Sequence, residues 1–318
     1  MSTKQSVSII IPCKNVDEYT RNCISYCKKL DYPNFEIILL PDNETDPIDD
    51  VRIITTGPVS PGVKRNIGVQ ELRNEYCAFI DNDAYPRSDW LTNAMKYFEY
   101  ADVGGVGGPG LTPEEDNYKQ KASGYVLSSF MVGNLSNRYK TKKCFESDDI
   151  HSCNFIARRS VVEAVGGWNE KYWPGEDTLM CLAITNLPMK LIEASDVVVY
   201  HHRRSLFKPH LKQVSRFGEH RGFFVKKFSD NSMKLTYFFP SLLLSSFIVG
   251  IVLSMIFPYF VFIMLFGVGA YLISSLVAAS LQVKRAKLLL LVWLGIITTH
   301  IVYGFFFLSG LVKRDLKR

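Results

Sequence analysis

The sequence predicts an α/β domain with a mainly parallel sheet, followed by a membrane region of about three transmembrane helices. The first 230 residues alternate short β-type runs with helical stretches, a pattern typical of parallel sheets. Residues 235–283 and 288–312 contain no Asp, Glu, Lys or Arg, although 21% of the chain is charged. At this composition, a charge-free run of 49 residues would arise by chance roughly once in a hundred thousand cases. The sequence therefore disfavours a fully soluble protein.

The overall composition excludes several classes of protein. The chain has 318 residues, of which 47% are apolar, and a net charge of +6. These values exclude a disordered chain, a collagen-like fibre and a highly charged nucleic-acid-binding tail, and we expect no nucleic-acid partner. The seven cysteines form no CxxC pair, which indicates reduced thiols in a cytosolic domain. The N-terminal apolar run of five residues predicts a strand and is too short for a secretion signal.

Seven elements are predicted in the first hundred residues, each from its own pattern. β-Branched and aliphatic runs predict strands, and apolar residues at helical spacing predict helices. We expect strands at 7–11, 35–40, 51–56 and 76–81, and helices at 18–30, 62–74 and 89–101. Strands that are apolar throughout imply a sheet covered on both faces. Ligands of such sheets bind at the carboxyl ends of the strands, so the residues after each strand are the candidate site.

Three segments of membrane-spanning length are predicted at 235–256, 259–281 and 288–311. Basic residues flank them, and we expect both clusters on the cytoplasmic side: Lys226, Lys227 and Lys234, then Lys284, Arg285 and Lys287. Three crossings would place the basic tail Lys313–Arg318 outside, against the positive-inside tendency, unless one segment is re-entrant. The sequence leaves this open, together with the alternative that these are buried helices of a soluble protein.

The chain is therefore expected to have three parts, at 1–205, 206–234 and 235–318. The middle part mixes Phe and Leu with Lys, Arg and His, a composition that suits a membrane interface. The alternative is a positively charged linker beside the membrane.

The motif Asp81-Asn82-Asp83 follows the fourth predicted strand. Two carboxylates separated by one residue can both face a ligand at a strand end, and Mg²⁺ or Mn²⁺ take such oxygen ligands together with substrate phosphates. The alternative is an ordinary turn. His201 and His202 end a later β-type run and are further candidate metal ligands, although a histidine at the edge of the core is the simpler interpretation.

Other polar groups also follow predicted strands or open predicted helices. Asp42 could accept hydrogen bonds from a base or ribose, or form an Asx turn. Donors at the start of the second helix could meet phosphate oxygens or the acidic loop, or form a solvated helix face: Lys64, Arg65 and Asn66. Glu176 and Asp177 could present a general base to a hydroxyl, or stabilise a helix N-terminus.

The order of these motifs is more specific than any one of them. It runs SIIIPCKN, PDNETD, KRNIG, FIDNDA, SCNFIARRSVVEAVGGWNEKYWPGED, HHRRS and QVSRFG. This series resembles glycosyltransferase family 2, the inverting transferases of the GT-A fold, over about residues 5–222. The predicted membrane segments resemble those of its membrane-bound members.

The resemblance implies donor-side roles for five residues. Pro12 and Asn15 match the motif after the first strand, which lies by the nucleotide. Asp42 matches the acid that contacts the base. Asp81 and Asp83 match the DxD pair, with Asp83 as the principal metal ligand.

The resemblance also implies roles on the acceptor side. Asn154 and Arg158 fall in the block that contains GGWNE. Asp177 matches the catalytic base of the ED motif, and its neighbour Glu176 is expected among the donor-binding residues. The QxxRW motif, which flanks the acceptor and the diphosphate, is matched with Phe in place of Trp by Gln213, Arg216 and Phe217.

From this resemblance we expect a membrane-bound transferase that moves a sugar from a nucleotide-sugar donor to a hydroxyl of a lipid-linked saccharide or polysaccharide. The metal, Arg216 and the basic residues at 64–65 would offset charge on the leaving nucleoside diphosphate. The expected location is the plasma membrane, with a cytoplasmic catalytic domain and membrane lipids as partners. The alternatives are a processive polysaccharide synthase, a polyprenyl-phosphate glycosyltransferase and a non-catalytic scaffold that retains the fold.

Overall fold

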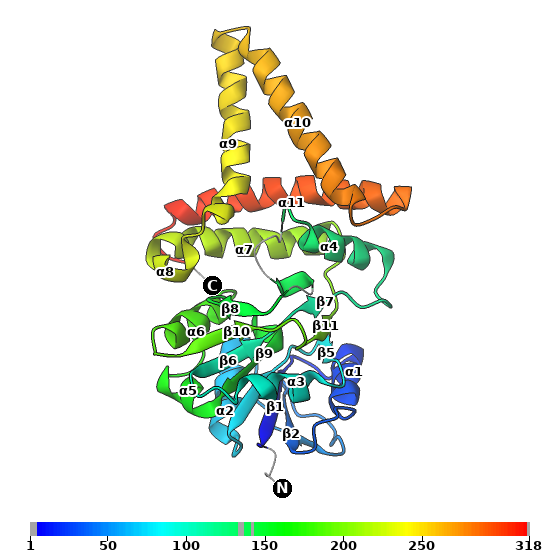
Figure 1. Cartoon of the computed structure of the whole chain (residues 1–318), viewed down its shortest axis with the longest axis vertical. Helices are drawn as coiled ribbons and strands as arrows, with labels where there is room; N and C mark the ends of the chain where they lie inside the picture. The colour runs from blue at the N-terminus through cyan, green and yellow to red at the C-terminus, as the bar shows by residue number, and fades with distance from the viewer. Residues whose placement is uncertain (1–4, 133–136, 141–142, 317–318) are drawn as a thin grey trace. The chain divides into compact units, whose positions relative to one another are not determined.

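The computed structural model describes residues 5–132, 137–140 and 143–316, and it divides into two compact units (Figure 1). Unit 1 comprises Met1–Pro113 and Asn137–His202, and unit 2 comprises Glu114–Ser136 and Arg203–Arg318. Unit 2 therefore includes a segment, 114–136, that the sequence analysis places within the N-terminal domain. Of the predicted basic tail, Lys317 and Arg318 lie outside the described residues.

The larger sheet of unit 1 has eight strands in the order β3-β2-β1-β4-β9-β6-β10-β8. In chain order these are β1 (Val7–Pro12), β2 (Phe35–Leu40), β3 (Val51–Ile53), β4 (Tyr76–Phe79), β6 (Val103–Gly107), β8 (Phe145–Ser147), β9 (Phe155–Arg158) and β10 (Lys190–Glu193). A smaller sheet has the order β5-β11-β7, formed by Ala84–Pro86, Val199–His201 and Gly110–Leu111 respectively.

The large sheet is mainly parallel, as predicted. Strands β3, β2, β1 and β4 run parallel to one another, and β10 runs parallel to β6. Strand β9 is inserted antiparallel between β4 and β6, and β8 is antiparallel at the edge beside β10. No pattern in the sequence predicted this reversal of direction. All four predicted strands are present, and β2 has the predicted bounds.

Alternate residues of the apolar strands supply two separate cores, one on each face of the sheet. Ile9 and Ile11 pack on one face with α1 (Glu18–Cys27) and α3 (Trp90–Tyr97). Ile10 and Leu40 pack on the other face, with the helices α2 (Pro61–Glu71), α5 (Arg159–Ala164) and α6 (Glu176–Thr185). This arrangement confirms the expected α/β layers with both faces covered.

Helix starts in unit 1 carry local signals that fix where the elements begin. Asp17 caps α1, because its carboxylate accepts a 2.9 Å hydrogen bond from the Thr20 amide. Ser60 is the N-cap of α2, and Pro61 occupies the first turn, where its missing N–H costs no hydrogen bond. The start of α2 thereby places Lys64, Arg65 and Asn66 in the first two turns.

Unit 2 is helical in its described residues. It contains α4 (Tyr118–Ser128), α7 (Lys208–Lys227), α8 (Ser229–Ser232), α9 (Leu235–Ile256), α10 (Phe260–Ser280) and α11 (Ala286–Val312). The last three match the three predicted apolar segments, and each is long and apolar enough to cross a membrane. Their mean hydropathy over 18 residues is 2.2, 2.3 and 2.0, respectively. Figure 1 shows α9 and α10 as a helical hairpin and α11 running beside α7.

Candidate functional site

The carboxyl ends of β1, β2 and β4 bring their following loops to one edge of the sheet. In the parallel register, Pro12 lies opposite Leu40, and Ile10 lies opposite Phe79. The loops are joined by backbone hydrogen bonds, such as that from the Asp42 amide to the Lys14 carbonyl at 3.0 Å. This edge is where ligands of such sheets bind, and it is where the sequence analysis expected the site.

Two carboxylates and an imidazole meet at this edge. Asp81 and Asp83 follow β4, and the pairing of β11 with β5 places His201 opposite Ala84. His201 Nε2 lies 3.2 Å from Asp83 Oδ1, and one ligand atom from each of Asp81, Asp83 and His201 lies within 4.8 Å of the others. Oxygen and imidazole ligands at such spacing fit a divalent cation. Among the residues that the structure describes, these three could therefore hold a metal.

His202, the other predicted histidine ligand, is not part of this cluster. Its amide donates a 2.9 Å hydrogen bond to the Asp83 carbonyl, and its ring packs against Tyr19 and Tyr85 with centroids at 4.5 and 5.8 Å. The two residues alternate in direction along the strand, so only one of the two rings can face the carboxylates. His202 therefore holds the Asp83 backbone, and His201 contributes the imidazole.

Sequence reasoning missed a thiol and a second imidazole behind His201. Cys153 Sγ lies 3.2 Å from His151 Nδ1. Burial alone would raise the pKa of the Cys153 thiol, but the nearby His151 and His201 lower it to about 6. Burial alone would lower the pKa of His201, but Cys153 and Asp83 raise it well above its usual value. The sequence signal for the thiol was the triplet Ser152-Cys153-Asn154, of which only Asn154 was named as a candidate residue.

Arg65 connects the DxD loop to the ED motif. Its side chain is only 2% exposed, with Nη2 at 2.8 Å from Asp81 Oδ1 and Nη1 at 3.0 Å from Glu176 Oε1. The guanidinium also lies 4.8 Å from the centroid of the Trp168 ring. The sequence left open whether the donors at this helix start meet phosphate oxygens or the acidic loop. In the structure, Arg65 contacts the acidic loop at Asp81.

The ED motif opens helix α6. Burial is the main cause that raises the pKa of Glu176 to about 7, the Asp177 charge adds to it, and Arg65 opposes it. Asp177 is half-buried, and its Oδ1 accepts a 2.8 Å hydrogen bond from the Thr178 amide. The two neighbouring acids therefore differ in their surroundings. Glu176 is buried and paired with Arg65, whereas Asp177 is more exposed to solvent.

The neighbours of Arg65 on α2 have structural partners. Lys64 is 2% exposed, with Nζ at 2.7 Å from Asp42 Oδ1, and it also donates to the Leu40 carbonyl at 3.1 Å. Lys64 thus holds the Asp42 loop at the end of β2. Asn66 donates to the Trp168 carbonyl at 2.9 Å and accepts from the Trp168 amide at 2.7 Å. Asn66 thereby fixes the GGWNE loop that precedes the ED motif.

The two residues of the predicted acceptor block lie in different places. Asn154 is buried, accepts from Trp90 Nε1 at 2.8 Å and donates to the Val197 carbonyl at 2.8 Å. Arg158 lies opposite Tyr76, at the start of β4, and donates to its hydroxyl at 2.9 Å. Because the DxD motif follows the other end of β4, the structure does not bring Arg158 to the site.

The remaining predicted residues are located as follows. Pro12 is the buried end of β1, and Asn15 is exposed in the loop after it, with its carbonyl accepting from Thr20 Oγ1 at 3.2 Å. The QxxRF residues lie on α7 of unit 2, where one is half-buried and two are exposed: Gln213, Arg216 and Phe217.

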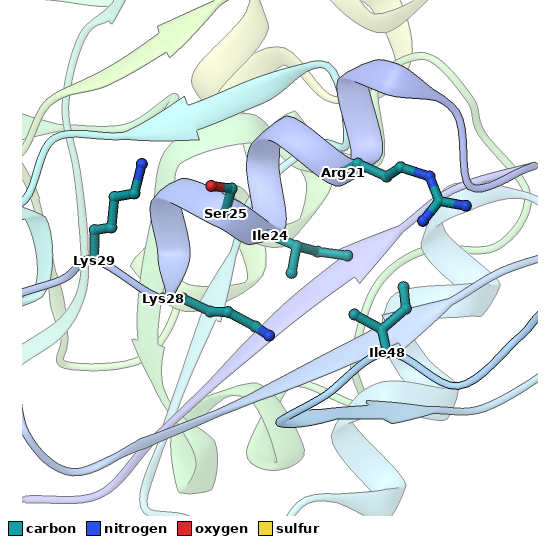
Figure 2. A pocket seen from close by; sticks show the side chains of 6 residues that line it. All are labelled: Arg21, Ile24, Ser25, Lys28, Lys29 and Ile48. Atoms are coloured by element: carbon teal, nitrogen blue, oxygen red, sulfur yellow. The ribbon is translucent and has the colours of Figure 1, made fainter.

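A separate cavity lies beside α1 (Figure 2). Its volume is about 410 Å³, and six residues line it: Arg21, Ile24, Ser25, Lys28, Lys29 and Ile48. None of the six belongs to the site described above, and the lining contains no carboxylate or imidazole. This cavity therefore lacks the acidic and imidazole side chains that the DxD–Arg65–ED network brings together.

Comparison with known families settles the class of enzyme. The family model described as "Glycosyl transferase family 2" matches residues 8–166, half of the chain. The chain belongs to glycosyl transferase family 2. The resemblance carried by the ordered motifs is thus confirmed, and the protein is a glycosyltransferase.

Relatives of this family 2 glycosyltransferase extend beyond the residues that the family model matches. It is 24% identical to a dolichyl N-acetyl-alpha-D-glucosaminyl phosphate 3-beta-D-2,3-diacetamido-2,3-dideoxy-beta-D-glucuronosyltransferase of Methanococcus voltae, covering 96% of this chain and 97% of the relative. It is also 24% identical to a probable glycosyltransferase of Bacillus subtilis, covering 74% of this chain and 60% of the relative.

Solved structures support the fold of the family 2 glycosyltransferase. A mannosyltransferase from Pyrobaculum calidifontis, solved in complex with GDP-Man and Mn²⁺, has a TM-score of 0.59 at 17% identity. The match covers 99% of this chain and 89% of that structure. Residues 1–349 of TarS from S. aureus match with a TM-score of 0.50 and 15% identity, over 72% of this chain and 67% of that chain. The expected GT-A type of fold is confirmed by these likenesses.

Proposed function

We propose that this glycosyltransferase moves one sugar from a nucleoside-diphosphate sugar to a hydroxyl of a lipid-linked saccharide, with inversion at the anomeric carbon. The observation that carries the proposal is the network in which Arg65 joins Asp81 of the Asp81–Asp83–His201 cluster to Glu176 of the ED motif. It brings a candidate metal site and a candidate general base to one edge of the sheet.

The donor diphosphate would bind at the Asp81–Asp83–His201 cluster. A divalent cation bound there would neutralise negative charge on the leaving nucleoside diphosphate. Carboxylates suit both Mg²⁺ and Mn²⁺, whereas an imidazole ligand is better suited to Mn²⁺. We therefore favour Mn²⁺, in agreement with the ion in the similar Pyrobaculum calidifontis structure. Asp42, held by Lys64, would contact the nucleoside, beside Pro12 and Asn15.

Asp177 would accept the proton from the acceptor hydroxyl as the oxygen attacks the anomeric carbon. Its position is suitable, because its half-buried carboxylate is oriented by the Thr178 amide and opens helix α6. Glu176 would remain with Arg65 and position the ED motif. One displacement, with no covalent sugar–enzyme intermediate, gives inversion.

The acceptor is proposed to be a lipid-linked sugar with a free hydroxyl. The name of the Methanococcus voltae relative describes transfer to a dolichyl N-acetylglucosaminyl phosphate, and the coverage of both chains is nearly complete. A polyprenyl phosphate is already an oxyanion and needs no general base, so the ED motif favours a hydroxyl acceptor. The apolar helices of unit 2 would hold the enzyme in the plasma membrane as a multi-pass protein, with the catalytic unit cytoplasmic and Gln213, Arg216 and Phe217 close to the headgroups.

The test replaces Asp177 by Asn in the full chain, with Glu18→Gln as the matched control. Glu18 is also an acid in the first turn of a helix, α1, but lies outside the network. With Mn²⁺, a set of nucleotide sugars and a membrane lipid extract, we expect Asp177→Asn to lower transfer by about 10²–10⁴-fold. Glu18→Gln is expected to leave it unchanged.

The lipid product of the same assay distinguishes the acceptors. Addition of one sugar to a lipid-linked saccharide is expected, whereas a ladder would indicate a processive synthase. Near-normal transfer by Asp177→Asn, or transfer directly to polyprenyl phosphate, would contradict the proposal.

A further inference from the structure

The second half of α11 lies against the beginning of α9. Ser241 Oγ, in the second turn of α9, donates to the Gly304 carbonyl at 3.2 Å. The rings of Phe238 and Phe307 lie 5.0 Å apart. A Cβ atom at Gly304 would lie 2.6 Å from the Pro240 carbonyl oxygen, so the two backbones are in direct contact here. Residues 304–307 are thus at the base of the hairpin where α9 starts.

The first half of α11 lies against the end of α10. Trp293 Nε1 donates to Ser275 Oγ at 2.9 Å, and His300 Nδ1 lies 2.8 Å from the Tyr271 hydroxyl. In a helical hairpin, the end of α10 and the start of α9 share one side. Helix α11 therefore passes from one leg to the other along the open base of the hairpin, as Figure 1 shows.

A membrane-crossing α11 would make different contacts. Its 27 residues are about 40 Å long, enough to cross hydrocarbon of about 30 Å. If it ran back beside α10, its last turns would approach the turn Phe257–Tyr259. Instead, Lys313 Nζ, directly after the helix, lies 2.6 Å from Glu219 Oε1 of α7, and the Lys226 side chain donates to the Lys313 carbonyl. The end of α11 is thus beside the chain that leads into α9.

Helix α7 accompanies α11 and is too polar for hydrocarbon. Their backbones are in close contact, because a Cβ at Gly222 would lie 2.0 Å from the Phe307 carbonyl oxygen. In the first turn of α7, His210 Nε2 lies 2.9 Å from Oγ1 of Thr299, which is in the middle of α11. The exposed charged residues of α7 include Lys212, Arg216 and Lys226. Charged side chains are unfavourable at the centre of a bilayer, so α7 cannot follow α11 through one.

The two faces of α11 differ accordingly. Its buried residues follow one face that packs within unit 2, including Val292, Ile296 and Phe307. The exposed apolar residues lie along a different face of α11: Leu290, Leu294, Ile301, Phe305, Leu308 and Val312. In the most apolar window, 39% of α11 is buried, compared with 11% for α9 and 6% for α10. Helices α9 and α10 expose apolar side chains nearly all round, whereas α11 exposes one side.

We propose that only α9 and α10 cross the bilayer and that α11 lies in the plane of the membrane interface. Its exposed apolar face would contact lipid acyl chains, and α7 would cover its other side towards the aqueous phase. The basic clusters at 226–234 and 284–287 and the residues Lys313 and Arg314 then share one side of the membrane. This arrangement obeys the positive-inside tendency without an exception.

The experiment locates three positions by labelling of single cysteines in the full chain. Cys144 is the exposed cysteine of the seven, so Cys144→Ser supplies the background. Three exposed residues are then replaced one at a time: Lys212→Cys on α7, Tyr259→Cys at the hairpin turn and Arg314→Cys after α11. Cells are treated with a membrane-impermeant maleimide, intact and after permeabilisation.

We expect Arg314→Cys and Lys212→Cys to be labelled from the same side of the membrane. Tyr259→Cys should be labelled from the opposite side. Labelling of Arg314→Cys together with Tyr259→Cys would mean that α11 crosses, and it would overturn the proposal. Labelling of all three from one side would mean that the hairpin does not cross, with the same consequence. Paired N-terminal and C-terminal reporter fusions to the native sequence give an independent measurement, expected to place both ends on one side. Neither readout depends on catalytic activity.

Discussion

Arg65 is the residue on which the candidate site depends most. It is almost completely buried between Asp81 and Glu176, with the Trp168 ring beside the guanidinium. Only a planar fork with several donors can satisfy both carboxylates from one position. The sequence indicated an arginine near the acidic loop, but it contained no sign that the same side chain also reaches the ED motif 111 residues later.

Replacement of Arg65 by Lys tests this role. An ammonium is a single point of charge and cannot hold both carboxylates in the same geometry, so we expect transfer to fall on the order of 10²-fold. The matched control is Arg52→Lys, since Arg52 pairs with Glu71 at the exposed surface, with 2.7 Å between the ions. Surface pairs contribute little, and the control should retain normal transfer and stability. Equal activity of the two variants would refute a positioning role for Arg65.

Glu176 makes stability depend on pH in a defined direction. Its pKa of about 7 in the folded protein lies above the usual glutamate value, so the folded state binds the extra proton between roughly pH 4.5 and 7. The contribution of this group to the free energy of unfolding is therefore present at low pH and is lost as the pH rises towards 7. Its size is at most on the order of 3 kcal/mol.

The measurement is a series of thermal melts in detergent across this pH range, with EDTA present. The melting temperature of the native protein should fall with rising pH relative to that of Glu176→Gln, which cannot titrate. Parallel curves for the two proteins would show that the buried carboxyl is already ionised at low pH.

At the scale of elements, the contact between α7 and α11 depends on glycines. A Cβ at Gly222 would lie 2.0 Å from the Phe307 carbonyl oxygen, and one at Gly310 would lie 2.0 Å from the Glu219 carbonyl oxygen. Both obstacles are backbone atoms, which no side-chain rotation can move. Glycines at these positions allow the two helices to approach closely along their second halves.

We expect Gly222→Ala to lower the free energy of unfolding by about 1–3 kcal/mol, because the helices must separate. Gly267→Ala on α10 is the control, since nothing lies within 4 Å of a Cβ at that position. Alanine also favours helix more than glycine does, so the control should be neutral or slightly stabilising. Melting curves and sensitivity to protease in detergent measure the difference. A Gly222→Ala protein as stable as the control would mean that the helices pack less closely.

The sequence predicted local elements better than their pairing. The apolar runs at β1 and β2 and the apolar segments at α9 and α10 were found within one residue of their bounds. Strand β9, by contrast, was missed as a member of the sheet, although its residues had been noted as a motif. Its four residues are too few for a periodic signal, and its direction is fixed by neighbours far away in the sequence, β4 and β6.

For the whole molecule, the charge-free blocks and the ordered motifs were sufficient to predict an α/β enzyme with membrane helices. They did not indicate that 114–136 belongs to unit 2. The reason is that the packing partners of α4 are distant in the chain. For example, the Val126 side chain of α4 packs against α11 at Gly295. Similarly, the network around Arg65 joins residues from three separate loops and helices, which only the fold brings together.

Biogenesis of this chain requires little translocation if α9 and α10 alone cross. Only the turn Phe257–Tyr259 is carried to the far side, because α9 ends at Ile256 and α10 begins at Phe260. The turn has no charged side chain, so its passage through hydrocarbon avoids the desolvation of an ion. The helical pair can then insert from the side where the ribosome synthesises it, without moving a charged side chain across the membrane.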